Sequence, residues 1–189
     1  MTDRPLRADA RGNQQRLLTV AAAAFARDGT QTSLKAVAKA AGVGVGTLYR
    51  HFPTREALVE AVYEHEVTVL CDAAAELLRT LGPADALQTW MERFVDFMAA
   101  KHGMADLLRP VLLSEADRLH TRARLRAAIA TLLDAGAAAG AIRPGVDAND
   151  VLMALGGVTM IAGEEGQRAL ATRLITLLLH GVRAPGPTS

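Results

Sequence analysis

The chain has few of the residues that build catalytic or metal centres. It contains one cysteine, Cys71, so it can form neither an internal disulfide nor a zinc site made of cysteines. Its histidines do not follow metal-site spacing, and consecutive side chains in the polar triplet at residues 64–66 point to different sides of a helix. No Gly-x-Ser-x-Gly motif occurs. We therefore expect no catalytic residue, no metal and no cofactor.

Long apolar runs are also missing. The longest strongly apolar, uncharged run covers residues 151–163, which is shorter than the roughly 18 residues that cross a bilayer. The first residues include Asp3 and Asp9 and lack the apolar region of a signal peptide. A single cysteine is typical of a reducing compartment. We expect a cytoplasmic protein without a membrane partner.

Aromatic residues are scarce, whereas alanine is abundant. Of the 189 residues, 4% are aromatic and 50% are hydrophobic, a composition that favours closely packed helices over sheets. We predict an all-α fold of about nine helices. Its expected parts are a flexible basic arm at 1–12, a DNA-binding domain at 13–53, a larger helical domain at 54–183 and a disordered tail at 184–189.

Charge is unevenly distributed along the chain. Residues 1–60 hold nine Lys and Arg against five Asp and Glu, a net charge of +4, whereas residues 61–189 hold 12 against 15, a net charge of −3. A basic end on a mildly acidic body is typical of proteins that bind nucleic acid. The arm at 1–12, with three arginines, is either a solvated tail or a segment that orders along DNA.

The stretch at residues 32–52 predicts two short helices joined by a glycine turn. Thr32 or Ser33 is positioned to cap the first helix, and Leu34, Val37, Ala38 and Ala41 share one of its faces. Gly42 ends that helix, and residues 45–51 form the second. This is the helix-turn-helix pattern, in which the second helix enters the DNA major groove. A phosphate-binding nucleotide loop at 43–46 is a poor alternative, because no strand precedes it.

The same stretch resembles the DNA-binding segment of the TetR family of transcriptional repressors. The resemblance is carried by Thr32-Ser33, Val37-Ala38, Ala41-Gly42-Val43, the run at 46–49, His51-Phe52 and the run at 54–58. It covers about the first 60 residues. It implies a ligand-responsive regulator that binds a palindromic duplex DNA operator as a homodimer. A small hydrophobic effector, not identified by the sequence, would release it.

We expect the exposed groups of this segment to contact DNA. By the resemblance, Tyr49 and His51 contact the backbone and residues 44–47 face the base edges. Arg50 has the geometry to bind a phosphate or a guanine, whereas Phe52 is expected in the core. Packing of Tyr49 against the protein is the alternative for that ring. The predicted DNA-binding residues are Thr32, Ser33, Lys35, Gly44, Val45, Gly46, Thr47, Tyr49, Arg50, His51, Thr54 and Arg55.

The second domain is expected to hold an effector. A helix beginning near residue 84 carries three of the large rings of the chain, Trp90, Phe94 and Phe97, and small-molecule sites are apolar with aromatic linings. Simple core packing is the alternative for each ring. The predicted pocket residues are Tyr63, Val67, Trp90, Phe94, Phe97, Met98, Met153 and Met160.

The last two helices are apolar on more than one face, which indicates a second copy of the chain as the partner. The predicted dimer interface is made of Leu152, Leu155, Gly156, Thr159, Leu174 and Leu178. Two alternatives stay open. One is a regulator that answers to a protein partner or to its own concentration; the other is a small-molecule-binding or catalytic helical protein whose helix-turn-helix is incidental.

Overall fold

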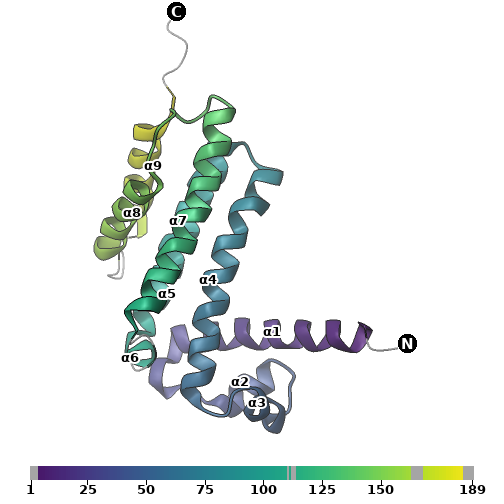
Figure 1. Cartoon of the computed structure of the whole chain (residues 1–189). Helices are drawn as coiled ribbons and strands as arrows, with labels where there is room; N and C mark the ends of the chain where they lie inside the picture. The colour runs from purple at the N-terminus through teal and green to yellow at the C-terminus, as the bar shows by residue number, and fades with distance from the viewer. Residues whose placement is uncertain (1–3, 110, 112–113, 163–167, 185–189) are drawn as a thin grey trace, which may run out of the picture. The chain divides into compact units, whose positions relative to one another are not determined.

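Helices account for almost all of the described chain. The computed structural model describes residues 4–109, 111, 114–162 and 168–184 (Figure 1). Within these residues the helices are α1 (Arg4–Asp28), the 3-10 helix η1 (Gly29–Gln31), α2 (Leu34–Ala40), α3 (Val45–His51), α4 (Arg55–Thr80), α5 (Pro83–Gly103), α6 (Ala105–Leu108), α7 (Glu115–Ala138), α8 (Ala148–Ala162) and α9 (Arg168–Val182).

The predicted fold class is confirmed. The described residues contain no β-strand, only one isolated antiparallel bridge between Ile142 and Arg183. No helix among them is both long enough and apolar enough to cross a membrane. Helix α1 begins at Arg4, within the segment at 1–12 that was expected to be a flexible arm. The sequence of residues 4–12 has no apolar periodicity that would indicate a helix. It does contain Arg and Ala, which have high intrinsic helix propensity. The expected tail lies, apart from Ala184, outside the described residues.

The chain divides into two compact units whose limits differ from the expected boundary after residue 53. The first unit comprises residues 1–66 and 100–115, and the second comprises residues 67–99 and 116–189. The first unit extends further than expected because α6 packs against η1 and because Leu58 and Val62 of α4 are buried. Helix α4 therefore begins in the first unit and continues into the second.

The core of the first unit is built from one face of each short helix. Helix α1 packs against α2, and α2 packs against α3. Phe25 of α1, Ala38 of α2 and Leu48 of α3 are fully buried. Gly42 has a φ of +70°, the left-handed conformation that lets α2 end and the chain turn into α3. The predicted helix-turn-helix is thus present.

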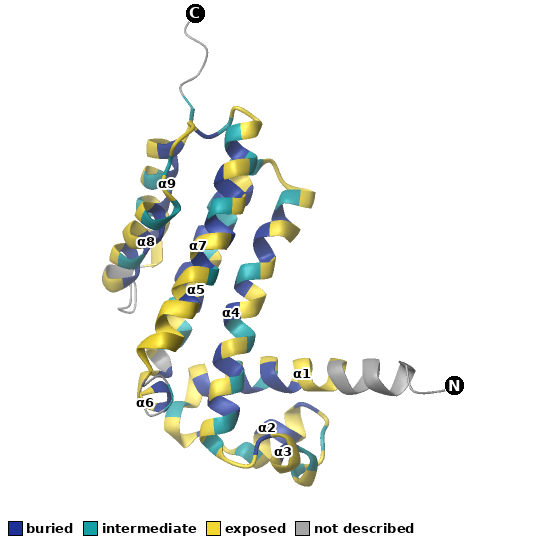
Figure 2. Cartoon of the chain, in the orientation of Figure 1, coloured by how far each residue is buried: buried dark blue, intermediate teal, exposed yellow. Residues whose placement is uncertain are grey.

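The second unit contains a close backbone contact after α7. In Figure 2, buried residues recur along α4 and α7. Near the end of α7, the buried Gly136 accepts hydrogen bonds from the backbone amides of Ala141 and Ile142, at 2.9 and 3.1 Å. A Cβ at Gly136 would lie 2.3 Å from Cγ1 of Ile142, which is itself 1% exposed. This glycine is therefore required by the packing of the turn.

We predict that Gly136→Ala lowers the free energy of unfolding by about 1–3 kcal/mol, because Ile142 cannot move without losing its own packing. Gly12→Ala is the matched control: Gly12 also lies in a helix, with nothing within 4 Å of an added Cβ. Alanine favours helix by up to about 1 kcal/mol over glycine, so the control should be neutral or slightly stabilised. Urea unfolding measures both, and equal midpoints would contradict the prediction.

Candidate nucleic-acid interface

Helix α2 is fixed at both ends. The Ser33 hydroxyl accepts a hydrogen bond from the amide of Ala36 at 3.3 Å, so Ser33, and not Thr32, is the cap. After α2, the amide of Val43 donates to the carbonyl of Ala38 at 3.0 Å. These bonds satisfy backbone groups that a helix seven residues long leaves open at its ends.

Helix α3 has one buried anchor and an exposed outer surface. The predicted bounds, residues 45–51, are confirmed. Leu48 is 0% exposed, whereas Tyr49 is 48% exposed and Arg50 and His51 are exposed. Tyr49 therefore does not lie packed against its own scaffold. Phe52 is buried, as expected, and follows the helix as its C-terminal cap residue.

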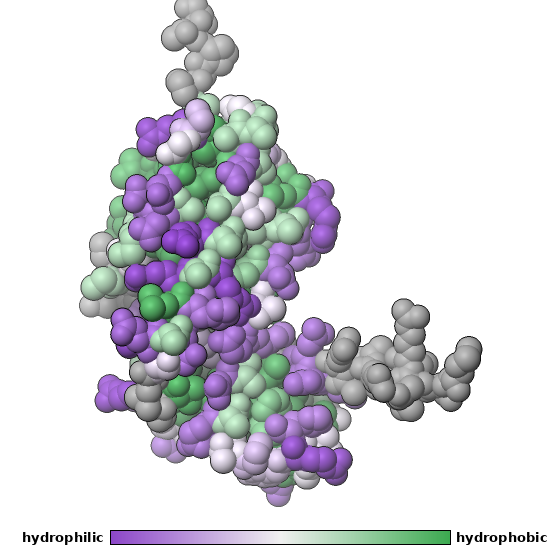
Figure 3. Space-filling model, in the orientation of Figure 1, coloured by the Kyte–Doolittle hydropathy of each residue, from purple (hydrophilic) through white to green (hydrophobic). Residues whose placement is uncertain are grey.

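Most of the predicted DNA-binding residues share this accessible surface. Figure 3 shows that the surface over α2 and α3 is mainly hydrophilic or neutral. Arg50 makes no side-chain hydrogen bond or ion pair with the described residues, so its guanidinium is available. The predicted residues that are exposed are Ser33, Lys35, Gly44, Gly46, Tyr49, Arg50, His51 and Thr54, and Val45 and Thr47 are half-buried.

Thr32 has a structural role in place of the predicted contact with DNA. Its side chain is 4% exposed, and its hydroxyl donates toward the carbonyls of Ala24 at 3.1 Å and Gly29 at 2.8 Å. A buried hydroxyl bound to two backbone carbonyls is not free to reach a phosphate. Thr32 therefore joins the end of α1 to the start of α2.

Arg55 was also predicted to contact DNA, but its guanidinium is engaged within the protein. Nη1 donates to the carbonyl of Thr32 at 2.8 Å, and Nη2 donates to those of Gly29 at 3.2 Å and Thr30 at 2.9 Å. The guanidinium carbon also lies 5.4 Å from the centroid of the Phe25 ring. Arg55 thus ties the first turn of α4 to the segment that precedes α2. Thr54 caps α4 as expected, accepting from the amide of Ala57 at 3.0 Å.

Two families of known proteins match this chain, one over its N-terminal part and one over its C-terminal part. Residues 17–62 match the family of bacterial regulatory proteins named after tetR, and residues 82–184 match the C-terminal domain of SbtR-like transcriptional regulators. The chain belongs to the TetR family. The sequence resemblance is confirmed, and the relatives are transcriptional regulators, not enzymes.

Solved TetR-family structures resemble the whole fold. A TetR transcriptional regulator, SCO0520 from Streptomyces coelicolor, is 45% identical, with a TM-score of 0.83 over 90% of this chain and 98% of that one. A TetR regulatory protein from Mycobacterium vanbaalenii is 36% identical, with a TM-score of 0.78 over 95% of this chain and 100% of that one.

Curated relatives match over shorter stretches. The transcriptional regulator UidR of Escherichia coli K12 is 31% identical over 94 residues, 49% of this chain. This match spans 42% of the length of UidR, so less than half of that relative is covered. The similarity to UidR therefore supports the family assignment and says nothing of what this TetR-family chain regulates.

Helix α8 is turned differently from the expectation. Leu152, Leu155 and Thr159, predicted to form the dimer interface, are buried within the chain, and the Thr159 hydroxyl donates to the carbonyl of Gly156 at 2.8 Å. Met153 and Met160, predicted to line the pocket, are 52% and 82% exposed. Because α8 carries apolar residues on both sides, the sequence pattern alone did not distinguish its inner face from its outer face.

The aromatic residues of α5 are packed in the second unit. Trp90 is fully buried, and its indole Nε1 donates to the carbonyl of Leu70 at 2.8 Å. Its ring stacks on that of Phe94 with centroids 5.9 Å apart, and Phe97 is 6.4 Å beyond Phe94. The indole N–H is therefore satisfied by the protein itself, and core packing, the alternative considered for these rings, describes Trp90 in this structure. Met98 is half-buried and Val67 is buried.

The first unit holds the remaining predicted pocket residue, Tyr63. It is buried, and Nζ of Lys101 lies 5.5 Å from the centroid of its ring. Glu66, one turn later on α4, is half-buried. Burial raises the pKa of its carboxyl, against the opposing effect of His65. The half-buried carboxyl of Glu66 therefore lies on the same part of α4 as Tyr63 and Val67, two of the predicted pocket residues.

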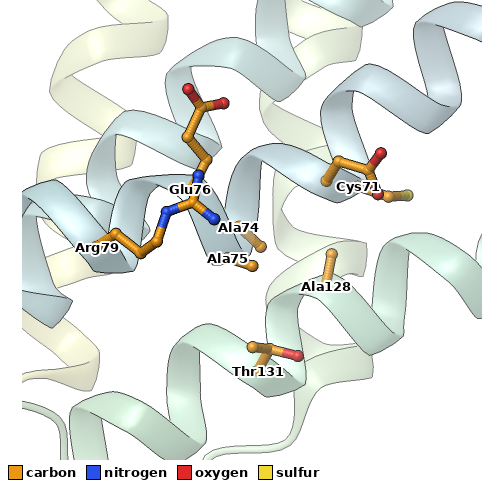
Figure 4. Close-up of a pocket in the computed structure, with 8 residues that line it drawn as sticks. Cys71, Ala74, Ala75, Glu76, Arg79, Ala128 and Thr131 are labelled. Carbon is orange, nitrogen blue, oxygen red and sulfur yellow. The ribbon is translucent and has the colours of Figure 1, made fainter.

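A groove that sequence reasoning missed lies between α4 and α7 in the second unit (Figure 4). It has a volume of about 390 Å³. Cys71, Asp72, Ala74, Ala75, Glu76 and Arg79 of α4 line it, with Ala128 and Thr131 of α7. None of these residues is aromatic, so the groove is distinct from the predicted aromatic pocket.

We predict that Arg55→Ala lowers the free energy of unfolding by about 2 kcal/mol, because three carbonyls lose a charged donor. Arg50→Ala is the matched control and should change stability by less than about 0.5 kcal/mol, since it removes an exposed arginine that has no side-chain bond to the described residues. Thermal unfolding of both variants, followed by circular dichroism, makes the comparison. Equal melting temperatures would show that Arg55 does not hold the motif.

Proposed function

We propose that the chain regulates transcription, as a repressor, by binding a palindromic duplex operator as a homodimer that a small hydrophobic effector releases. The observation that carries the proposal is the exposed outer surface of α3. Tyr49, Arg50 and His51 project from a helix whose other side is anchored by the buried Leu48. Gly44 and Gly46 carry no side chain, which allows the start of α3 to approach base edges closely.

Two kinds of contact are expected at this surface. Hydroxyl, imidazole and guanidinium groups bind phosphate oxygens and set the position of the protein, whereas contacts to base edges give specificity. Val45 and Thr47 can touch thymine methyl groups, and Arg50 or Lys35 can pair with guanine. Because few side chains at the start of α3 form hydrogen bonds, DNA shape is expected to contribute to the choice of sequence.

Exposed apolar residues on α8 and α9 support the homodimer. Met160 is 82% exposed and Leu177 is 68% exposed. Leu177 also lines a hollow of about 400 Å³, together with Arg143, Ala154, Val158, Leu174, Leu178, Gly181 and Val182. Exposed apolar residues gathered on two adjacent helices are typical of a protein interface. The same surface of a second copy would cover them and would place two α3 helices about a two-fold axis, which requires a palindromic operator.

The effector step is supported by the continuity of α4. This helix runs from Arg55, at the DNA-binding motif, to Thr80 in the second unit. A ligand that favours one arrangement of residues 67–80 would act on the same helix that Arg55 ties to the motif. Such a ligand could shift the equilibrium between the DNA-binding state and the released state only by the difference between its binding free energies for these two states.

We predict that the chain binds a duplex selected from a random pool, with an affinity that falls steeply with salt because phosphate contacts release counterions. Arg50→Ala should weaken binding by roughly tenfold to a hundredfold, about 1–3 kcal/mol, if Arg50 reads a base. Arg118→Ala, which removes an exposed arginine on α7, is the control and should leave affinity unchanged. Fluorescence anisotropy across salt concentrations measures both. The proposal would be contradicted if the wild-type protein showed no binding to duplex DNA at low salt concentration.

We also predict that Leu177→Lys makes the chain monomeric, because the exposed leucine would be buried by the second copy, where a lysine charge is costly. Leu119→Lys, at an exposed leucine on α7, is the control and should remain dimeric. Sedimentation velocity gives the mass of each variant. A dimeric Leu177→Lys variant would place the interface elsewhere, and a monomeric wild-type protein would contradict the homodimer itself.

A further inference from the structure

A small hollow lies between α1 and α3, on the flank of the predicted recognition helix. Its volume is about 150 Å³, and it is lined by Asn13, Gln14 and Leu17 of α1 together with Val43, Thr47, His51 and Phe52. None of the predicted DNA-binding residues lies on α1. The hollow therefore brings polar residues of α1 beside two residues that were expected to contact DNA.

The lining is divided by chemistry. Leu17 and Phe52 are buried and form an apolar floor, with the half-buried Val43. The remaining lining residues each carry a hydrogen-bond donor, and none of the lining residues is acidic: Asn13, Gln14, Thr47 and His51. Within the described residues, the side chains of Gln14, Thr47 and His51 make no hydrogen bond. These donors are therefore available to an acceptor from outside.

Arg16 fixes the orientation of Asn13. Its Nε donates to the carbonyl of Ala41 at 3.2 Å, and its Nη2 donates to Oδ1 of Asn13 at 2.7 Å. A guanidinium has donors only, so the amide oxygen of Asn13 must face it. The amide nitrogen of Asn13, with its two N–H groups, is then the end left for another partner. Because Ala41 is the C-terminal cap residue of α2, the same arginine links this amide to the helix-turn-helix.

Size and chemistry together indicate the occupant. Pockets for drug-sized ligands measure roughly 300–1,000 Å³, more than this hollow provides. A single sugar–phosphate unit has apolar C–H groups on the sugar and acceptor oxygens on the phosphate, and so matches an apolar floor edged by donors. The hollow is also continuous with α3 through Thr47 and His51, which lie one turn apart on the same side of that helix.

We propose that this hollow binds one sugar–phosphate unit of the DNA backbone, with Asn13 as a phosphate donor and Arg16 as the residue that positions it. The proposal rests on the proposed function, since it requires that the chain bind duplex DNA. It adds α1 to the interface and gives α3 a fixed distance from one backbone strand.

Asn13→Asp tests the donor. Aspartate keeps an oxygen for Arg16 but replaces the two N–H groups by a second anionic oxygen, which repels a phosphate. Gln15→Glu is the matched control: it makes the same charge change at an exposed residue of α1 that does not line the hollow. With the palindromic duplex selected by the wild-type protein, Asn13→Asp should weaken binding about tenfold or more relative to Gln15→Glu, as expected for the loss of a charge-assisted bond.

A second readout separates a direct contact from a structural effect. Methylphosphonate groups placed one at a time along the duplex remove the charge of single phosphates. The wild-type protein should lose affinity at the phosphate that occupies the hollow, whereas Asn13→Ala and Arg16→Ala should lose little further affinity at that position and the usual amount at the others. Asn13→Ala also decides the matter if Asn13→Asp fails to fold.

The outcomes separate the two proposals. A wild-type protein that selects no duplex refutes the proposed function and this site with it. A wild-type protein that binds while Asn13→Asp binds like Gln15→Glu refutes the site alone. The site would also be refuted if Asn13→Ala lost as much affinity as the wild-type protein at every methylphosphonate position. That result would mean that Asn13 affects binding only through the fold.

Discussion

The position of helix α3 depends on the burial of Leu48. A helix of seven residues is not stable by itself in water, because the cost of its first turn is not recovered over so short a length. Leu48 is fully buried, and its immediate neighbours Thr47 and Tyr49 are half-buried and exposed. One apolar contact therefore fixes the rotation of α3 and decides which side chains point outward.

The support around α3 consists mainly of bonds to backbone carbonyls. Arg16 reaches the carbonyl at the end of α2, Thr32 the end of α1, and Arg55 the three carbonyls around η1. Each of these side chains satisfies acceptors that short helices leave unpaired at their ends. The tight turns of the motif are thereby held without a large core, and the exposed residues remain free for another partner.

The helices and the anchoring residues of the motif could be predicted from the sequence because they follow local rules. Apolar spacing predicted α2, and the position of Gly42 predicted the turn that separates it from α3. The roles of Thr32 and Arg55 could not be predicted in this way, because their partners lie up to 26 residues away and a carbonyl is present at every position. Helix α8 shows a second limit. Leu155 and Met160 are both apolar, and only the packed structure tells which one faces inward.

The account requires that the outer surface of α3 lie in a DNA groove. A crystal structure of the chain bound to the duplex that it selects is the most direct measurement. We predict α3 in the major groove, with Tyr49, Arg50 and His51 within hydrogen-bond distance of phosphates or bases. A complex in which these three side chains face solvent while the duplex contacts another surface would contradict the account.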